Sequence, residues 1–183
     1  MKAVATPVAA LAALIAAVAT PALAELKPGA KAPDFTAQAY LAGQPFTFKL
    51  ADAVKKGPVV VYFFPAAHTS GCNMEAHLFS EAIDQFKAQK ATVIGVTAGK
   101  ISELAEFSKE TEHCGGKFPV AADPGAVIAK QYDAVLSMKP DWSSRTSYVI
   151  GRDGKVAFAY DNLNPNDHVA QTLGAVKSLN AKK

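Results

Sequence analysis

Cysteine is scarce in this sequence of 183 residues, which contains only Cys72 and Cys114, and tryptophan occurs once. In an exported protein two cysteines often form one structural disulfide, and that interpretation stays open for both residues. An excess of one charge is also missing, because 19 lysines and arginines are mixed along the chain with 16 aspartates and glutamates. The absence of a basic block, apart from the terminal Lys182 and Lys183, argues against nucleic acid and anionic membranes as partners.

Long apolar runs are scarce too, and the longest lies near the start of the chain. Lys2 precedes a run of Ala, Leu, Val and Ile at 8–19, and an Ala-Leu-Ala segment at 22–24 fits a small-x-small cleavage site. This is the pattern of a secretory signal peptide. A retained membrane anchor is the alternative, but the run is shorter than the roughly 20 residues that span a bilayer. We therefore expect residues 1–24 to be cleaved and the protein to be exported, to the periplasm in a Gram-negative host.

The remaining residues, 25–183, contain no repeats, no low-complexity segment and no linker rich in proline or serine, so we expect a single domain. Apolar segments typical of strands alternate with segments of helical period. The predicted order is a hairpin at 35–41 and 45–50, a helix at 50–55, strands at 58–64, 91–96 and 118–122 alternating with helices at 72–89, 102–113 and 124–132, a second hairpin at 146–150 and 155–160, and a last helix from 165. This order predicts an α/β domain with a mixed central sheet, helices on both faces and an N-terminal hairpin.

The most informative segment is Pro-Ala-Ala-His-Thr-Ser-Gly-Cys at 65–72, between a buried strand and a helix. It places Cys72 where the helix begins. The first turn of a helix has unpaired backbone N–H groups and the positive end of the macrodipole, which favour a thiolate over a thiol. Thr69 lies three residues earlier, close enough to share a small pocket with the sulfur.

The pattern Pro65-x-x-x-Thr69-x-x-Cys72 at such a junction resembles the peroxidatic signature of the peroxiredoxins. Gly71-Cys72-x-x-Glu75 is most similar to the Q-type subfamily, also called bacterioferritin comigratory protein. Segments at 29–35 and 118–124 resemble further parts of the family, so the likeness covers most of the chain after residue 24. It implies a thioredoxin-like fold, no metal, haem or flavin cofactor, and reduction of hydrogen peroxide and organic hydroperoxides by a thiol.

The resemblance also implies roles for individual residues. Cys72 attacks the peroxide, Thr69 and Arg145 hold the peroxide and the developing charge, and Pro65 shields the pocket. Arg145 precedes a predicted late strand, as does the arginine of peroxiredoxins that points at the sulfur; without the cysteine it would be interpreted as a solvated surface charge. Glu75 is either a carboxylate that orders the loop or an ordinary first-turn glutamate favoured by the helix dipole.

The route by which Cys72 is recycled is less defined. Many Q-type enzymes have a resolving cysteine five residues after the peroxidatic one, and this position is His77. Cys114, near the end of the following predicted helix, remains. It resolves Cys72 to a disulfide, or an outside thiol reduces Cys72 directly, or Cys114 is an inert core thiol. We favour the first, with an exported thioredoxin-like protein as reductant, and we expect a monomer or weak homodimer.

Single residues argue against two other classes of protein with a similar fold. An exported thiol–disulfide oxidoreductase needs Cys-x-x-Cys, where this chain has Glu75, and a copper chaperone needs Cys-x-x-x-Cys, where it has Ala76. A metal site from His68, Cys72 and His77 is weak because the helical period turns His77 roughly 140° away from the cysteine. We therefore expect no metal and a polar loop role without chemistry for His68. The alternative that stays open is a non-catalytic or thiol–disulfide-exchange protein of the envelope with a thioredoxin fold.

Overall fold

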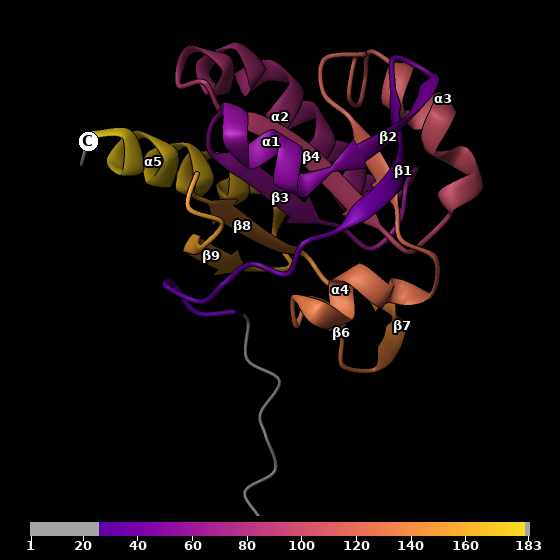
Figure 1. The fold of residues 1–183 in the computed structure, drawn as a ribbon. Coiled ribbons are helices and arrows are strands. Elements are labelled where there is room, and N and C mark those ends of the chain that lie inside the picture. Colours follow the sequence, from indigo (N-terminus) through magenta and orange to yellow (C-terminus); the bar gives the residue numbers. More distant parts are fainter. Residues whose placement is uncertain (1–25, 182–183) are drawn as a thin grey trace, which may run out of the picture.

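The structure is a computed structural model that describes residues 26–181, so the predicted signal peptide lies outside the described part. Seven strands form one sheet in the order β2-β1-β5-β4-β3-β8-β9 (Figure 1). The strands are β1 Thr36–Leu41, β2 Gln44–Lys49, β3 Val59–Phe63, β4 Thr92–Thr97, β5 Val120–Ala122, β8 Thr146–Ile150 and β9 Val156–Asp161, with β6 Val135–Leu136 and β7 Lys139–Ser143 in a separate two-stranded sheet. The helices are α1 Leu50–Lys56, α2 Ser70–Ala88, α3 Leu104–Lys109, α4 Val127–Gln131 and α5 His168–Ala181, with short 3-10 helices η1 Ile101–Glu103, η2 Pro124–Ala126 and η3 Pro165–Asp167.

The sheet is mixed, as predicted. β3, β4 and β5 are parallel neighbours, while β8 pairs antiparallel with β3 and β1 pairs antiparallel with β5. The predicted N-terminal hairpin is β1 and β2, which turn through Ala42 and Gly43, both at positive φ. Two such residues form the kind of turn whose twist matches that of the flanking strands. All five residues of β3 are buried, as expected of a strand covered on both faces.

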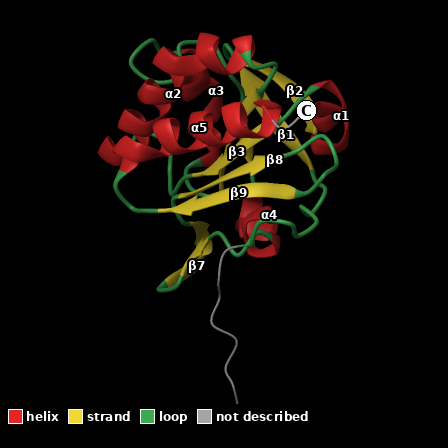
Figure 2. Cartoon of the chain, turned by 90° about the vertical axis from the view of Figure 1, so that its left-hand side faces the viewer, coloured by secondary structure: helices red, strands yellow, loops and turns green. Residues whose placement is uncertain are grey.

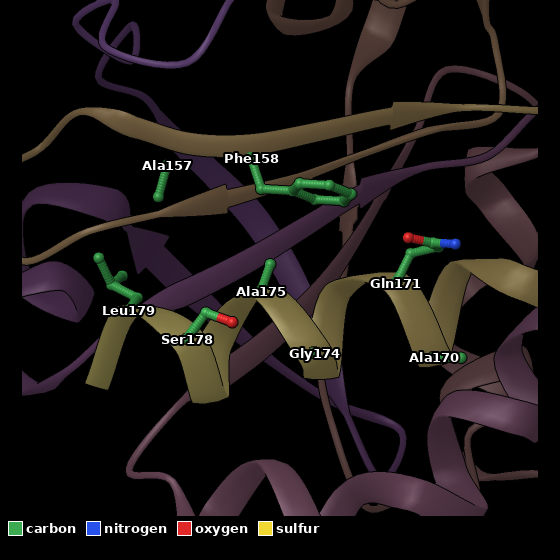
Figure 3. Close-up of a pocket in the computed structure, with 8 residues that line it drawn as sticks. All are labelled: Ala157, Phe158, Ala170, Gln171, Gly174, Ala175, Ser178 and Leu179. Carbon is green, nitrogen blue, oxygen red and sulfur yellow. The ribbon is translucent and has the colours of Figure 1, made fainter. Parts of the chain in front are cut away.

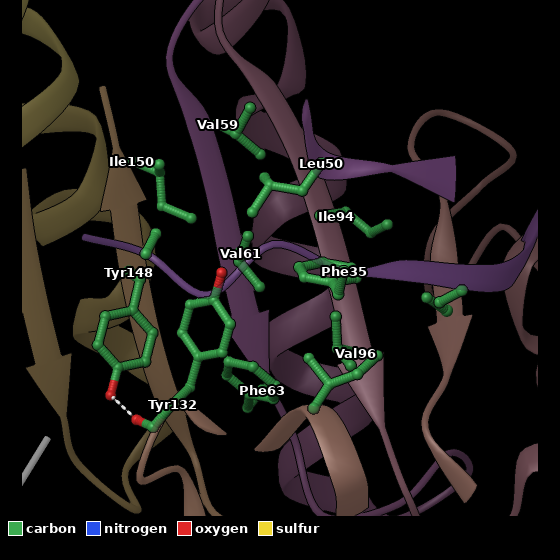
Figure 4. Packing of buried hydrophobic residues seen from close by; sticks show 14 of the residues in the cluster. Phe35, Leu50, Val59, Val61, Phe63, Ile94, Val96, Tyr132, Tyr148 and Ile150 are labelled. Carbon is green, nitrogen blue, oxygen red and sulfur yellow. Dashed lines mark hydrogen bonds between the residues drawn. The ribbon is translucent and has the colours of Figure 1, made fainter. Parts of the chain in front are cut away.

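Helices cover both faces of the sheet (Figure 2). Alternate residues of β3 point to opposite faces, so its apolar run serves two clusters. Val59, Val61 and Phe63 pack under α1 and α4, where the Tyr148 hydroxyl donates to the Tyr132 carbonyl at 2.5 Å (Figure 4). The alternate residues of β3, Val60 and Tyr62, pack on the opposite face, under α2, α3 and α5. This second cluster also contains both cysteines, so Cys72 and Cys114 are part of the core.

Helix α2 is positioned by the apolar side that it turns toward the sheet. Phe79 and Ile83 are buried on this side, and the Phe79 ring stacks on that of Tyr62 with centroids 4.5 Å apart. Leu78, which we expected on the same side, is only partly buried because it lies at the edge of the stripe. The packing of α2 therefore fixes the position of its first turn, which carries Cys72.

The predicted helix at 102–113 is wrong at both ends. It begins as η1 at Ile101, so Ser102 is an exposed residue inside the turn and not a cap, and α3 ends at Lys109. Gly115 and Gly116, both at positive φ, turn the chain back so that their N–H groups bond the carbonyls of Glu110 and Ser108. Such bonds satisfy carbonyls at a helix end. As a result, Cys114 lies in a tight turn after α3 and not in the helix.

The hairpin formed by β6 and β7 is absent from our sequence prediction. Its strands are short and do not alternate between apolar and polar residues, so hydrophobic periodicity does not predict them. Met138 at the tip is 98% exposed, while the Lys139 ammonium lies 3.4 Å from the centre of the Trp142 ring. This hairpin leads the chain to Arg145 and β8. In the described part of the chain, no helix is long and apolar enough to cross a membrane.

The stacking of Phe79 on Tyr62 gives a first prediction. Phe79→Ala should lower the free energy of unfolding by about 3–5 kcal/mol, since the ring is fully buried and its removal leaves a cavity. Val127→Ala, at a helical position that is 57% exposed, is the control and should change it by less than about 0.5 kcal/mol. Urea denaturation measures both. A loss below about 1 kcal/mol for Phe79→Ala would contradict this account of the core.

Candidate active site

The loop between β3 and α2 is held by the end of β4. Ala66 pairs with Gly99 as an isolated parallel bridge, and the Thr97 hydroxyl donates to the Pro65 carbonyl at 3.1 Å. A Cβ atom on Gly99 would lie 2.2 Å from the Pro65 carbonyl oxygen, so only glycine allows this approach. These contacts fix Pro65 at the start of the loop, upstream of the cysteine.

Cys72 is the third residue of α2 and is only 1% exposed. It is a free thiol, and the Nη2 atom of Arg145 donates to its sulfur at 3.5 Å. Thr69 is the N-cap residue of the helix, yet its hydroxyl makes no capping bond and donates to the Ala66 carbonyl at 3.0 Å. The predicted placement of Cys72 at a helix start, beside Arg145, is therefore what the structure shows.

Arg145 directly precedes β8 and is 5% exposed, so it is no solvated surface charge. Its Nε donates to the Leu163 carbonyl at 2.9 Å, and its Nη1 donates to the Gly71 carbonyl at 3.3 Å and to the Glu75 carboxylate. A Cβ atom on Gly71 would lie 3.0 Å from Nη2, so the glycine before the cysteine makes room for the guanidinium. Burial alone would lower the pKa of Arg145, but the charges of Glu75 and Cys72 raise it above its ordinary value.

Glu75 is fully buried and contacts Arg145 through Oε2. Because α2 begins at Ser70, Glu75 lies in the second turn, and the interpretation as an ordinary first-turn glutamate is wrong. Burial raises the pKa of Glu75 to about 8, although the Arg145 guanidinium acts to lower it. Its second oxygen, Oε1, has no hydrogen-bond partner among the described residues.

His168 lies behind Glu75 and was missed in the sequence. It is fully buried at the start of α5, and its Nδ1 is 3.5 Å from Glu75 Oε1. Its Nε2 lies 2.8 Å from the Asn162 carbonyl, which can only accept, so Nε2 carries the proton. Burial and the charge of Arg145 lower the pKa of His168, so Nδ1 is an acceptor for the Ser147 hydroxyl at 2.8 Å. If Glu75 Oε1 carries a proton, that proton faces His168 Nδ1, which is an acceptor. No sequence motif predicts the contact between Glu75 and His168.

Cys114 is brought against α2 but is not bonded to Cys72. Both thiols are free and buried in the same core cluster. The turn that carries Cys114 packs on the third turn of α2, since the Lys117 ammonium donates to the Ser80 carbonyl at 3.2 Å. Burial, with a smaller effect of the Glu110 charge, raises the pKa of Cys114 well above its ordinary value.

A shallow groove of about 420 Å³ lies elsewhere on the molecule, between β9 and α5 (Figure 3). Most of the residues that line it are small and apolar, and Phe158 and Leu179 have the largest apolar side chains among them. None of the residues predicted for the site borders it. The groove is therefore separate from the buried group around Cys72.

Comparison with known proteins agrees with this geometry. Residues 28–159 match the AhpC/TSA family, and the chain therefore belongs to this family. The chloroplastic peroxiredoxin Q of Oryza sativa subsp. japonica is 31% identical over 152 residues, which are 82% of this chain and 67% of the rice protein. That of Populus jackii is 32% identical over 126 residues, which are 68% of this chain and 58% of the poplar protein. The resemblance to the Q-type peroxiredoxins is thus confirmed.

Solved structures confirm the predicted thioredoxin-like fold. The crystal structure of peroxidoxin BcpB from Mycobacterium tuberculosis has a TM-score of 0.74 at 24% identity and covers 84% of this chain and 98% of its own. Reduced 2-Cys peroxiredoxin from Plasmodium vivax has the same TM-score at 21% identity, with 85% and 97% covered. The family match and the peroxiredoxin Q relatives show that the chain is a thiol-dependent peroxidase, and a non-catalytic envelope protein is not favoured.

The buried carboxyl group of Glu75 gives a prediction on pH. Its pKa is about 8 in the folded state and near 4.5 when exposed, so the folded state binds more protons between these values. The resulting contribution to stability is complete below pH 4.5 and is lost as the pH rises through about 8. Relative to Glu75→Gln, the wild type should therefore lose more than about 1 kcal/mol of unfolding free energy over this range.

Urea denaturation of both proteins at pH values from 4.5 to 8 tests this. Glu106→Gln removes a carboxylate that is 56% exposed and serves as the matched control. Parallel curves for wild type and Glu75→Gln would show that Glu75 is ionised throughout the range.

Proposed function

We propose that Cys72 is the peroxidatic cysteine of this peroxidase and that Arg145 is the cation of its site. The observation that carries the proposal is the Nη2 contact to the Cys72 sulfur at 3.5 Å, within a helix start that is closed to solvent. A guanidinium stays charged at all relevant pH values and has several donors in a fixed plane. It can therefore hold the thiolate and the peroxide oxygens together.

The chemistry follows from these groups. The Cys72 thiolate attacks the terminal peroxide oxygen, the O–O bond breaks, and the departing oxygen takes a proton to leave as water or an alcohol. Cys72 is oxidised to sulfenic acid and the peroxide is reduced. Arg145 stabilises the negative charge that moves from the sulfur to the departing oxygen.

Thr69 and Pro65 are proposed to shape the pocket. The Thr69 hydroxyl donates its hydrogen bond to the Ala66 carbonyl, so its oxygen keeps lone pairs that can accept a hydrogen bond from a peroxide. Pro65 lies two residues after the end of β3, and its carbonyl accepts a hydrogen bond from the Thr97 hydroxyl, which suits a residue that limits water access. We assign Glu75 the role of holding Arg145, because its carboxylate shares Nη1 with the Gly71 carbonyl.

We propose that Cys114 resolves the sulfenic acid. Its thiolate would attack the Cys72 sulfur, form the disulfide and release the sulfenic oxygen as water. A disulfide needs Cα atoms within about 7 Å of each other, so the first turn of α2 must unwind. Gly71 in that turn, and Gly115 and Gly116 beside Cys114 at positive φ, supply flexible positions on both sides.

The remaining proposals concern the surroundings of the enzyme. The apolar segment at 8–19 and the Ala-Leu-Ala site at 22–24 support export to the periplasm after cleavage, with residues 25–183 as one domain. An exported thioredoxin-like protein would then open the disulfide by exchange. We propose a monomer or weak homodimer.

Intact mass after one equivalent of hydrogen peroxide tests both cysteines. Wild type should lose two hydrogens as the disulfide forms, while Cys114→Ser should gain one oxygen as trapped sulfenic acid. Cys72→Ser should show neither change and should have no peroxidase activity. Sulfenic acid in both wild type and Cys114→Ser would overturn the role of Cys114. Full activity of Cys72→Ser would overturn the mechanism itself.

Substitution of Arg145 tests the cation. Arg145→Ala should slow the reaction with peroxide about 10²–10³-fold, as for the loss of a group that stabilises developing charge. Because this change leaves Glu75 buried without its partner, Arg145→Ala/Glu75→Gln is measured beside it. Arg152→Ala, at an exposed arginine that bonds the Lys55 carbonyl, is the control and should react at the wild-type rate. Stopped-flow kinetics with hydrogen peroxide would refute the assignment if the Arg145 variants also kept that rate.

A further inference from the structure

Four side chains meet beside the peroxidatic loop in an arrangement that the peroxidase reaction does not use. His68, the residue before Thr69, lies between two carboxylates, with Nδ1 2.7 Å from Glu103 Oε2 and Nε2 2.8 Å from Glu110 Oε2. His113 Nε2 lies 3.4 Å from the same Glu110 oxygen. The ligand atoms of His68, Glu110 and His113 all lie within 4.8 Å of one another.

This donor set is one that divalent zinc prefers. Imidazole nitrogen and carboxylate oxygen bind Zn²⁺ at about 2.0–2.2 Å, and three protein ligands with an open fourth position are a common arrangement. Glu103 adds the outer partner of such a site, because a metal-bound histidine usually donates its other ring N–H to a carboxylate. His68 has this geometry, with one nitrogen toward Glu103 and the other toward Glu110 and His113.

The cluster is held in place and partly shielded. The side chains of His68, Glu110 and His113 are 27%, 30% and 12% exposed, so a cation can enter and is then partly desolvated. The Phe107 ring packs against both imidazoles, with centroids 5.3 Å from that of His68 and 4.8 Å from that of His113. The His113 Nδ1 atom is buried and has no hydrogen-bond partner among the described residues, so the ring is turned toward Glu110 through Nε2 alone.

We propose that His68, Glu110 and His113 bind a divalent cation of the zinc class, with Glu103 holding His68 and water completing the coordination. These ligands differ from the site of His68, Cys72 and His77 that was considered from the sequence. Cys72 contacts Arg145, and His77 lies 3.4 Å from Glu81, so neither belongs to the cluster.

The place of the cluster gives the cation a regulatory effect, which rests on the proposed function. His68 precedes Thr69 in the loop, and His113 precedes Cys114 in the turn after α3. A bound cation ties these two segments together in their folded arrangement. Because disulfide formation requires α2 to unwind and Cys114 to be approached, the cation slows resolution and leaves the attack of Cys72 on peroxide unchanged.

Binding is tested with Co²⁺ as a spectroscopic probe and Zn²⁺ as competitor, on protein purified without a polyhistidine tag. Cys72→Ser/Cys114→Ser is used beside the wild type so that thiols cannot supply ligands. Both proteins should show the visible bands of four-coordinate Co²⁺, displaced by Zn²⁺, without thiolate charge-transfer bands. His113→Gln and Glu110→Gln should abolish the bands, and Glu103→Gln should weaken binding about 10–100-fold.

His77→Gln is the matched control, since His77 shares a surface hollow with His113 but points to Glu81. It should bind Co²⁺ as the wild type does. Unchanged binding in both His113→Gln and Glu110→Gln would overturn the site, as would bands that vanish in the double cysteine variant. Thermal melting of each variant shows that it is folded.

A second measurement separates this proposal from the proposed function. Mass spectrometry after rapid mixing with peroxide follows sulfenic acid and disulfide with and without Zn²⁺. Zinc should slow disulfide formation at least tenfold in the wild type and have no such effect in His113→Gln. Equal rates with zinc bound would overturn the regulatory effect. Failure to form a disulfide even without zinc would refute Cys114 as resolver, while the cobalt spectra would still decide the metal site.

Discussion

The buried guanidinium of Arg145 is the interaction on which the rest of the site depends. A guanidinium removed from water must find acceptors for its donors, or its burial is very costly. Arg145 finds them on Gly71, Cys72 and Glu75 of α2 and on the Leu163 carbonyl after β9. One side chain thus connects the start of α2 to the far edge of the sheet.

The sheet register brings this arginine to the cysteine. Phe63 at the end of β3 pairs with Thr146 at the start of β8, so the residue before β8 lies beside the loop that follows β3. The backbone pairing of β3 with β8 brings together Arg145 and Cys72, which are 73 residues apart in the sequence. The contact between the guanidinium and the sulfur is therefore a consequence of topology, and the helix start alone does not create it.

Charge balance explains why Glu75 is buried next to this pair. Ionised Glu75 would compete with the Cys72 sulfur for the single positive charge of Arg145, which contacts both. Burial raises the pKa of Glu75 to about 8, which favours its neutral form, and Oε2 accepts from Nη1 in either form. Its Oε1 then faces Nδ1 of His168, which accepts because its own pKa is lowered. A neutral carboxyl group at this position would hold Arg145 and leave the charge of the guanidinium to the sulfur.

The sequence predicts what is periodic or local. Apolar runs locate β3 and β4, and the spacing of Pro65, Thr69 and Cys72 locates the loop. The end of α3 was misplaced because a pair of glycines turns the chain back through tertiary contacts. His168 and the cluster around His68 were missed for a related reason: polar residues from separate segments carry no common period, and only the folded chain brings them together.

The two cysteines show how the same burial leads to different chemistry. Both thiols are almost fully inaccessible, but Cys72 has the helix start and Arg145, whereas Cys114 has burial and the Glu110 charge, which both disfavour its thiolate. Burial keeps Cys114 protonated, and a protonated thiol is a poor nucleophile toward sulfenic acid. Unwinding of α2 would expose the turn that packs on it, lower the pKa of Cys114 toward its ordinary value and let the sulfurs approach. In the proposed mechanism, one opening motion would supply both the geometry and the thiolate for resolution, and a cation bound at the cluster around His68, which would hold the loop to this turn, would control both.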